Sequence, residues 1–384
     1  MRHISNFVLV CINHLLLSSS YKLSLQTRLL PTYFFIHSIT MSDSTLPTRK
    51  LGKNGPSVTG LGLGLMGLSA FYGPKKPDEE RFKLLDYAYD AGERFWDSAD
   101  MYGDNEDLLG EYFKKNPDKR KGVFLATKFG NKVDSDGNRS VDSSYDYCKS
   151  ACAKSLSRLQ LPKIDLYYVH RLNSETPIEE TMKALKELQD EGKIKYIGLS
   201  ECSAESLRRA CKVVHVDAVQ LEYSPFSLEI EQPEFNLLKT CRELGTAVVA
   251  YSPIGRGMIT GAIRSLDDLE EDDFRRYAPR FSAENFPKNL QLVDRIKALA
   301  DKKGVTPTQL TLAWLMAQGD DIFPIPGTTK IERLQENLDA TKIKLTSEEE
   351  KEIRQACENA EVHGGRYAEA FSAYCFVDTV PAKA

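Results

Sequence analysis

The stretch GLGLMG, Gly62 to Gly67, raises the question of the fold because its glycines follow the spacing G-x-G-x-x-G. That spacing is typical of the dinucleotide-binding turn of a Rossmann fold, which needs a strand before it, a helix that opens inside it and an acidic residue about 20 positions later. The next residues, LSAFYGPKKPDEE, include Gly73, Pro74 and Pro77, which would break such a helix. A convincing helical pattern begins only near Asp78. The Rossmann interpretation is therefore disfavoured.

Outward from this stretch, short apolar runs alternate with amphipathic helical patterns almost to the end of the chain. The predicted strands are VTGLGLG, ERFWD, VFLATK, IDLYYVH, IKYIGLS, VDAVQLE, TAVVAYS and DIFPIP. Among the predicted helices are EERFKLLDYAYDAG, DYCKSACAKSLSRLQ, IEETMKALKELQDEG, AESLRRACKVV and EFNLLKTCREL, with apolar residues at i, i+3, i+4 spacing. Gly92, Gly192 and Gly245 stand where a helix should end and the chain should turn toward the next strand.

Strands that alternate with helices pair in parallel, because each crossover returns the chain to the same end of the sheet. Eight such units predict an α/β protein with a single closed (β/α)8 TIM barrel. An open, doubly wound sheet is the alternative. The segment LDDLEEDDFRRY and the C-terminal segment Ser347–Ala384 would add extra helices and loops to the barrel.

The composition limits the class of function. With 41% hydrophobic and 28% charged residues, the 384-residue chain is typical of a globular protein with an ample core. Because 51 Lys and Arg are balanced by 55 Asp and Glu, we expect no basic face for nucleic acid. The eight cysteines include no CxxC pair and no Cys/His metal spacing, so we expect no metal and a reduced intracellular setting.

Residues 1–40 differ from the rest of the chain. They contain no Asp or Glu and many Ser, Thr and aliphatic residues, which is the composition of a transit peptide, and no apolar run reaches the roughly 20 residues of a membrane span. Two interpretations compete: a mitochondrial leader, or translated sequence upstream of a true start at Met41. The second is favoured because a regular Arg-rich stripe is missing. We expect residues 1–40 to be disordered and residues 41–384 to form the domain, with its core at about 51–354.

Polar residues end several predicted strands, and in a parallel barrel those ends meet at one rim. Each has an ordinary explanation alone: a helix cap for an Asp, a solvated Lys, a core His. As a set at one rim they indicate a catalytic site. The set is Asp97, Lys128, His170, Ser200 and Gln220, with Tyr102 in the loop over the same rim.

Four of these residues form a plausible proton donor. A nearby Lys128 ammonium is expected to stabilise the phenolate of Tyr102 and lower its pKa. Asp97 would keep Lys128 charged, and His170 would orient a substrate oxygen. A group that protonates an oxygen needs a hydride source, which implies a nicotinamide cofactor. No G-x-S-x-G turn or HExxH motif offers other chemistry.

Several motifs in order resemble the aldo-keto reductase superfamily, from Leu51 to about Arg354. They are WDSADMYGDNEDLLGEYF, FLATKFG, DLYYVHR, GKIKYIGLSE, AVQLEYSPF, VVAYSPIGRGMITG and PIPGTTKIERLQENL. The chain is most similar to the fungal and bacterial branch that includes pyridoxal reductases, through GLMGLSAFYG and RFSAENFPKN. The resemblance implies an NADPH-dependent carbonyl reductase that acts on an aldehyde, such as pyridoxal, or on a ketone. The alternative is a regulatory subunit that senses bound NADPH, like the potassium-channel β subunits.

The resemblance also implies roles for single residues. The catalytic residues would be Asp97, Lys128, His170 and Tyr102, the last as general acid. The cofactor NADPH or NADP+ would be bound by Gly64, Met66, Ser200 and Gln220 at the nicotinamide, by Tyr251 through stacking, and by Ser252, Gly255, Arg256 and Gly257 at the pyrophosphate. Thr328, Thr329, Lys330 and Arg333 would bind the 2′-phosphate, and Glu336 and Asn337 the adenine. Two cations at the 2′-phosphate favour NADPH over NADH.

Glu201 departs from the Asn that the family often has after Ser200, which puts a contact of this residue with the nicotinamide in doubt. The segment Phe274–Asn289 is a candidate lid. Candidate pocket neighbours are Phe71, Tyr72, Trp96 and Arg171, although aromatic residues at a barrel mouth are equally well explained as packing. The expected partner is a small carbonyl substrate, with no nucleic acid and no membrane, and we expect a monomer or a weak homo-oligomer. The expected location is cytoplasmic, or mitochondrial if residues 1–40 are a genuine leader.

Overall fold

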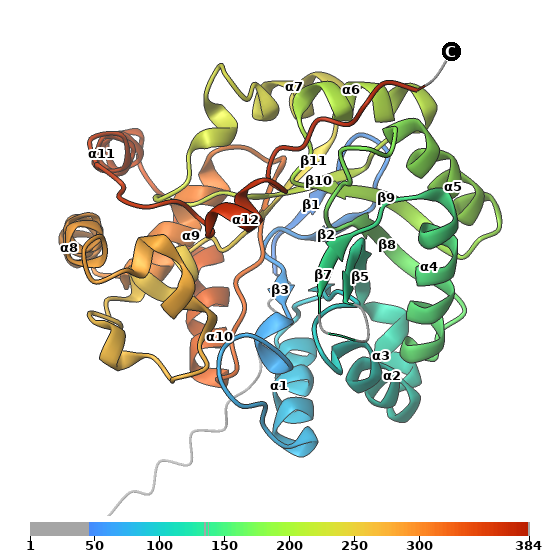
Figure 1. Ribbon diagram of the computed structural model, residues 1–384. Coiled ribbons are helices and arrows are strands. Elements are labelled where there is room, and N and C mark those ends of the chain that lie inside the picture. The colour runs from blue at the N-terminus through green and yellow to red at the C-terminus, as the bar shows by residue number, and fades with distance from the viewer. Residues whose placement is uncertain (1–45, 134–135, 137, 383–384) are drawn as a thin grey trace, which may run out of the picture. The chain divides into compact units, whose positions relative to one another are not determined.

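Eight parallel strands form one sheet in a computed structural model that describes residues 46–133, 136 and 138–382 (Figure 1). The expectations for residues 1–40 lie outside this part of the chain. The strands are β3 (Leu63–Gly64), β4 (Phe95–Asp97), β5 (Phe124–Phe129), β8 (Ile164–Val169), β9 (Ile194–Ser200), β10 (Ala218–Glu222), β11 (Ala247–Tyr251) and β12 (Ile322–Pro324). Their order in the sheet is β12-β11-β10-β9-β8-β5-β4-β3.

The first and last strands of this sheet meet and close it. Gly64 forms a parallel bridge with Gly327, and the amide of Gly62 donates to the carbonyl of Pro324 at 2.9 Å. A Cβ at residue 64 would lie 2.8 Å from the carbonyl oxygen of Ile325, and one at residue 327 would lie 2.9 Å from the carbonyl oxygen of Gly64. Only glycine allows so close an approach of two backbones. The predicted (β/α)8 barrel is confirmed, and the open sheet is wrong.

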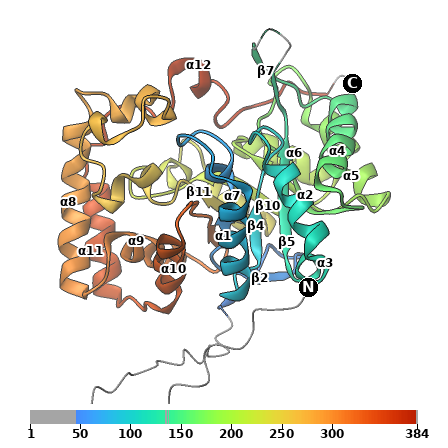
Figure 2. The same cartoon turned by 90° about the horizontal axis from the view of Figure 1, so that it is seen from below.

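Helices surround the strands on the outside (Figures 1 and 2). They are α1 (Asp78–Asp90), α2 (Asn105–Lys115), α3 (Pro117–Gly122), α4 (Tyr145–Leu159), α5 (Ile178–Asp190), α6 (Ala204–Val213), α7 (Leu237–Leu244), α8 (Phe286–Lys303), α9 (Pro307–Ala317), α10 (Ile331–Asp339), α11 (Ser347–Glu358) and α12 (Glu369–Ser372). Gly92, Gly192 and Gly245 follow α1, α5 and α7 with φ of 91°, 73° and 70°, which confirms them as the turns that leave these helices.

The predicted first strand, VTGLGLG, is wrong as a single element. Ser57–Thr59 forms strand β2, which pairs antiparallel with β1 (Thr48–Lys50), and only Leu63–Gly64 joins the barrel. The hairpin closes the end of the barrel where the strands begin: the amide of Lys53 donates to the carbonyl of Gly245, just before β11. An apolar run looks the same in both settings, so periodicity could not separate them.

Two further departures concern connections. A second hairpin, β6 (Asn131–Val133) with β7 (Arg139–Val141), follows β5 and had no clear pattern in the sequence. The segment LDDLEEDDFRRY forms only short 3-10 turns, Leu266–Asp268 and Phe274–Tyr277, rather than a regular helix. The predicted C-terminal decoration is present as α11, α12 and an extended tail.

The tail crosses the carboxyl ends of the strands, drawn in red in Figure 1. Val377 forms a parallel bridge with Cys202, just after β9, and Arg209 of α6 donates to the carbonyl of Thr379 at 2.7 Å. The tail therefore lies at the end of the barrel where parallel strands carry functional side chains.

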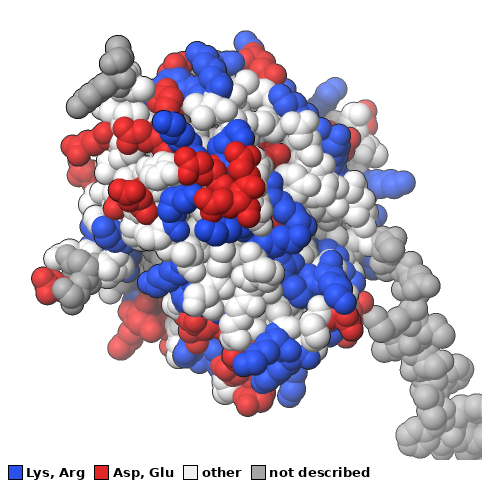
Figure 3. Space-filling view, turned by 90° about the vertical axis from the view of Figure 1, so that its right-hand side faces the viewer, with Lys and Arg blue, Asp and Glu red and all other residues white. Residues whose placement is uncertain are grey.

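Acidic and basic side chains are interspersed on the face that Figure 3 shows, without one dominant sign. No helix within the described residues is long and apolar enough to cross a bilayer.

Packing inside the barrel leaves no room for a side chain at one glycine of β9. Gly198 lies opposite the fully buried Tyr168 of β8, and a Cβ there would lie 2.2 Å from the tyrosine ring. We expect Gly198→Ala to destabilise the fold by about 1–3 kcal/mol in chemical denaturation, because the ring must move within a packed core. Gly67→Ala is the control, since its nearest atom is 3.6 Å away and φ is ordinary. Equal effects of the two changes would contradict this account of the barrel interior.

Candidate active site

Three neighbouring strands bring four predicted catalytic residues together. Asp97 ends β4, Lys128 lies in β5, and His170 follows β8 directly. Tyr102 comes from the loop between β4 and α2. All four side chains are buried, and the rings of Tyr102 and His170 meet edge to face with centroids 5.8 Å apart.

A buried ion pair is the centre of this cluster. The Nζ of Lys128 lies 2.5 Å from Oδ1 of Asp97, 2.6 Å from the carbonyl oxygen of Ser98 and 3.4 Å from the hydroxyl of Tyr102. The other carboxylate oxygen of Asp97 accepts from Nε2 of Gln220 at 2.9 Å. Burial lowers the pKa of Lys128, but Asp97 and Tyr102 outweigh it and raise the pKa above its ordinary value. The ammonium is therefore held charged next to the phenol.

The pKa of Tyr102 corrects a prediction made from the sequence. Burial raises the phenol pKa, and Lys128, which lowers it, does not overcome that effect. The predicted net lowering is wrong in this structure because the phenol is almost completely buried, which residue types and spacing do not reveal. The phenol therefore keeps its proton at neutral pH and is a proton donor.

His170 is neutral for a similar reason. Burial first, then the positive charges of Arg171 and Lys128, place its pKa well below the ordinary value. Its Nδ1 is buried without a hydrogen-bond partner among the described residues. A neutral imidazole next to a phenol can orient an uncharged oxygen without adding charge to the site.

Ser200 and Gln220 lie at the ends of β9 and β10, as predicted, but neither is without a partner. The hydroxyl of Ser200 accepts from Arg171 at 3.3 Å, and the amide nitrogen of Gln220 is bonded to Asp97. Both carboxylate oxygens of Glu201 accept from Arg366 at 3.0 Å, so this side chain is engaged in an ion pair.

The predicted pyrophosphate loop follows β11. Ser252, Gly255, Arg256 and Gly257 all have positive φ. The guanidinium of Arg256 donates to Glu222 at 3.1 Å and to the carbonyl of Arg366 at 2.7 Å. Its side chain is thus turned toward protein groups, which differs from the expected role at a phosphate.

The turn before α10 has the features of an anion site. The hydroxyl of Thr328 accepts from the amide of Lys330 at 3.1 Å, and no side chain caps the N-terminus of the helix. Lys330 and Arg333 are exposed and have no ion-pair partner within the described residues. Uncapped amides and unpaired cations together suit a phosphate. Further along α10, Glu336 is partly exposed and Asn337 is buried.

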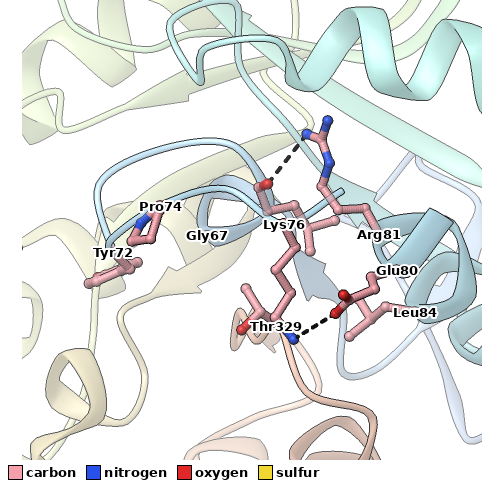
Figure 4. Close-up of a pocket in the computed structure, with 9 residues that line it drawn as sticks. Gly67, Tyr72, Pro74, Lys76, Glu80, Arg81, Leu84 and Thr329 are labelled. Atoms are coloured by element: carbon pink, nitrogen blue, oxygen red, sulfur yellow. Dashed lines mark hydrogen bonds and ion pairs between the residues drawn. The ribbon is translucent and has the colours of Figure 1, made fainter. Parts of the chain in front are cut away.

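This turn adjoins the loop after β3. Thr329 and Gly67 line the same cavity of about 50 Å³, together with Tyr72 and Lys76 (Figure 4). Lys76 contacts Glu80 at 3.3 Å. Gly64 and Met66, the other predicted cofactor residues from this region, are partly exposed. The two ends of the sequence-predicted site therefore meet in space.

Of the predicted pocket neighbours, Trp96 is wrong. It is fully buried outside the barrel, stacked on Phe113 of α2 with ring centroids 5.8 Å apart. Side chains of a strand alternate between faces, so Trp96 must point away from the side that Asp97 faces. Phe71 does lie at the site, edge to face with Tyr102 at 6.4 Å.

The candidate lid Phe274–Asn289 lies against the loop after β3. The amide of Phe274 donates to the carbonyl of Phe71 at 3.2 Å, and Arg275 stacks over the ring of Tyr72 at 4.9 Å. These contacts place the segment beside the site; its role as a lid stays a prediction.

The sequence interpretation missed two residues of the C-terminal tail, Arg366 and Tyr367. The hydroxyl of Tyr367 donates to that of Tyr251 at 3.1 Å, and its ring lies 4.4 Å from the guanidinium of Arg256. No local sequence pattern marks this tail as part of the site. Within the part of the chain that the structure describes, no group of His, Cys, Asp and Glu could hold a metal.

Comparisons with known proteins agree with one another. Residues 60–358 match the sequence profile of the aldo/keto reductase family. The aldo-keto reductase yakc of Schizosaccharomyces pombe, whose name carries NADP(+), is 52% identical over 340 residues, 88% of this chain and 99% of the relative. The aldo-keto reductase str7 of Strobilurus tenacellus is 51% identical over 326 residues, 84% of this chain and 95% of the relative.

Two solved structures are similar to this chain in fold. A glycerol dehydrogenase from Gluconobacter oxydans is 25% identical with a TM-score of 0.73, covering 83% of this chain and 97% of that one. A thermostable aldo-keto reductase in complex with the inhibitor epalrestat is 29% identical with a TM-score of 0.65, covering 81% of this chain and all of that one.

The buried ion pair predicts a pH-dependent loss of stability. Burial already raises the pKa of Asp97 above its ordinary value, and Lys128 opposes this effect. Lys128→Met removes the cation, which costs about 3–5 kcal/mol and raises the pKa of Asp97 further. The penalty is absent below the unfolded pKa of about 3.9, grows as the pH rises and is complete above the folded pKa. Chemical denaturation between pH 4 and 8 measures it. The double change Asp97→Asn and Lys128→Met should remove the pH dependence, and a penalty that is equal at all pH values would contradict the ion pair.

Proposed function

The chain belongs to the aldo/keto reductase family, and we propose that it is an oxidoreductase that uses NADPH to reduce the carbonyl group of an aldehyde or ketone. The observation that carries this proposal is the buried cluster at the strand ends, in which the neutral phenol of Tyr102 lies beside the charged ammonium of Lys128. Such a cluster can protonate an oxygen that is becoming an alkoxide.

Bound NADPH would supply the hydride. Tyr102 gives the phenolic proton to the carbonyl oxygen, and Lys128 stabilises the phenolate that remains. Asp97 keeps Lys128 charged inside the barrel, and neutral His170 donates a hydrogen bond that orients the carbonyl oxygen. The proton is recovered from solvent after product leaves.

The residues fit the cofactor at both of its ends. Lys330 and Arg333, next to the open N-terminus of α10, supply unpaired positive charge for a 2′-phosphate. The partly exposed Tyr251 offers a ring for stacking at the nicotinamide end. Arg256 would contribute at the pyrophosphate only if a phosphate drew its guanidinium away from Glu222.

The substrate is an aldehyde in our proposal, with pyridoxal as one candidate. Phe71 packs edge to face on both Tyr102 and Phe274, and these rings suit a flat aromatic carbonyl compound. A cytoplasmic location and a monomeric or weakly associated state complete the proposal.

The direct test of the chemistry is Tyr102→Phe. This variant should bind NADPH as the unchanged protein does, but reduce aldehydes at least about 100-fold more slowly, because the general acid is missing. Absorbance at 340 nm reports NADPH consumption with pyridoxal, aromatic and aliphatic aldehydes. Near-normal turnover of the variant would refute the role of Tyr102. Tight NADPH binding by the unchanged protein without turnover of any aldehyde would favour a regulatory subunit instead.

The selectivity for the cofactor is tested at Arg333. Arg333→Ala should weaken NADPH binding about 10-fold or more and change NADH binding little, because only NADPH carries the 2′-phosphate. Glu332→Ala, on the same exposed turn, is the matched control and should weaken neither cofactor. Equal losses for NADPH and NADH would show that Arg333 does not contact the 2′-phosphate.

A further inference from the structure

The fully buried carboxylate of Glu201 lies next to Tyr251, the ring on which we propose that the nicotinamide stacks. Glu201 follows Ser200 with φ of 50° and no exposed surface. Besides its two bonds from Arg366, its Oε1 accepts from the hydroxyl of Tyr251 at 2.9 Å. The ring on which the nicotinamide would stack is therefore one hydrogen bond away from a buried negative charge.

The cation that compensates this charge comes from the far end of the chain. Arg366 precedes α12 in the C-terminal segment, and its side chain is only 7% exposed. The next residue, Tyr367, bonds to Tyr251. The backbone of Glu201 also binds the tail, because its carbonyl accepts from the amide of Val377 at 2.9 Å. The C-terminal tail, the carboxylate of Glu201 and the ring of Tyr251 are thus joined by hydrogen bonds into one connected unit.

Glu201 is ionised in this unit. Burial raises the pKa of Glu201, but Arg366, Arg171 and Tyr251 outweigh it, so that the pKa falls below its ordinary value. Arg366 also lies 3.9 Å from both Glu222 and Glu229. Glu222 pairs in turn with Arg256 at 3.1 Å and with Arg280 at 3.6 Å. A buried, fixed charge acts strongly on any charge that appears nearby.

The two forms of a nicotinamide ring differ by such a charge: the oxidised ring carries a positive charge and the reduced ring is neutral. We propose that Arg366 is a positioning residue that neutralises Glu201 behind Tyr251, and so sets the balance between NADPH and NADP+ binding. This inference rests on the proposed function. Without Arg366 the free carboxylate would attract the oxidised ring, and product cofactor would be released less readily.

The test measures the dissociation constants of NADPH and NADP+ for the full chain by fluorescence titration at pH 8. In Arg366→Met, the ratio of the NADP+ constant to the NADPH constant should fall roughly 10-fold, because the uncompensated carboxylate favours the cation. Glu201→Gln should shift the ratio in the opposite direction, because it removes the buried negative charge bonded to Tyr251 while the positive charge of Arg366 stays. The double variant, which lacks both charges, should return to within about threefold of the unchanged protein.

The matched control is Arg209→Met. Arg209 also fastens the tail, through the carbonyls of Thr379 and Val380, but lies outside the site. It should leave the ratio unchanged. A ratio that stays constant in both Arg366→Met and Glu201→Gln, or that shifts equally in Arg209→Met, would overturn the inference. Failure of the proposed function has a different result: the unchanged protein would then bind neither NADPH nor NADP+, and the inference would fall with it.

Discussion

The closure of the barrel between two glycines is the constraint on which the site depends. Gly64 and Gly327 bring the first and last strands together at a distance that no Cβ would permit. This contact places the loop after Gly64 beside the turn Thr328–Lys330, although more than half of the chain separates them. Gly62 and Gly64 of GLGLMG therefore serve the closure of the sheet rather than a phosphate turn at a helix N-terminus, and the proposed cofactor site is assembled from both ends of the domain.

Charges inside the mouth of the barrel are balanced across elements. Asp97 pairs with Lys128 from the neighbouring strand, Glu222 with Arg256 from the loop after β11, and Glu201 with Arg366 from the tail. A buried charge without a partner is costly, so each pair fixes the position of the segment that supplies its cation. The same electrostatics that hold loop and tail in place also keep the ammonium charged beside the phenol. In the proposed function, stability and chemistry thus share one set of residues.

Much of this arrangement follows from the sequence, for identifiable reasons. Alternating periodicities predict the barrel, and residues at strand ends, such as Asp97 and His170, must then share a rim. The alternation of side chains along a strand already places Trp96 and Asp97 on opposite faces, so the outward position of Trp96 can be read from the sequence. The raised pKa of Tyr102 cannot, because it depends on how deeply the phenol is buried. The partner of Glu201 is 165 residues away, on a tail with no periodicity to place it.

The central claim is that one cofactor binds segments from both ends of the domain at once. Hydrogen–deuterium exchange of the full chain with and without NADPH tests it most directly. The account predicts that peptides covering residues 62–67, 252–257 and 327–337 become protected together, while the hairpin at residues 48–59, at the opposite end of the barrel, exchanges as before. Protection that is absent at residues 327–337, or that appears at the hairpin instead, would contradict it.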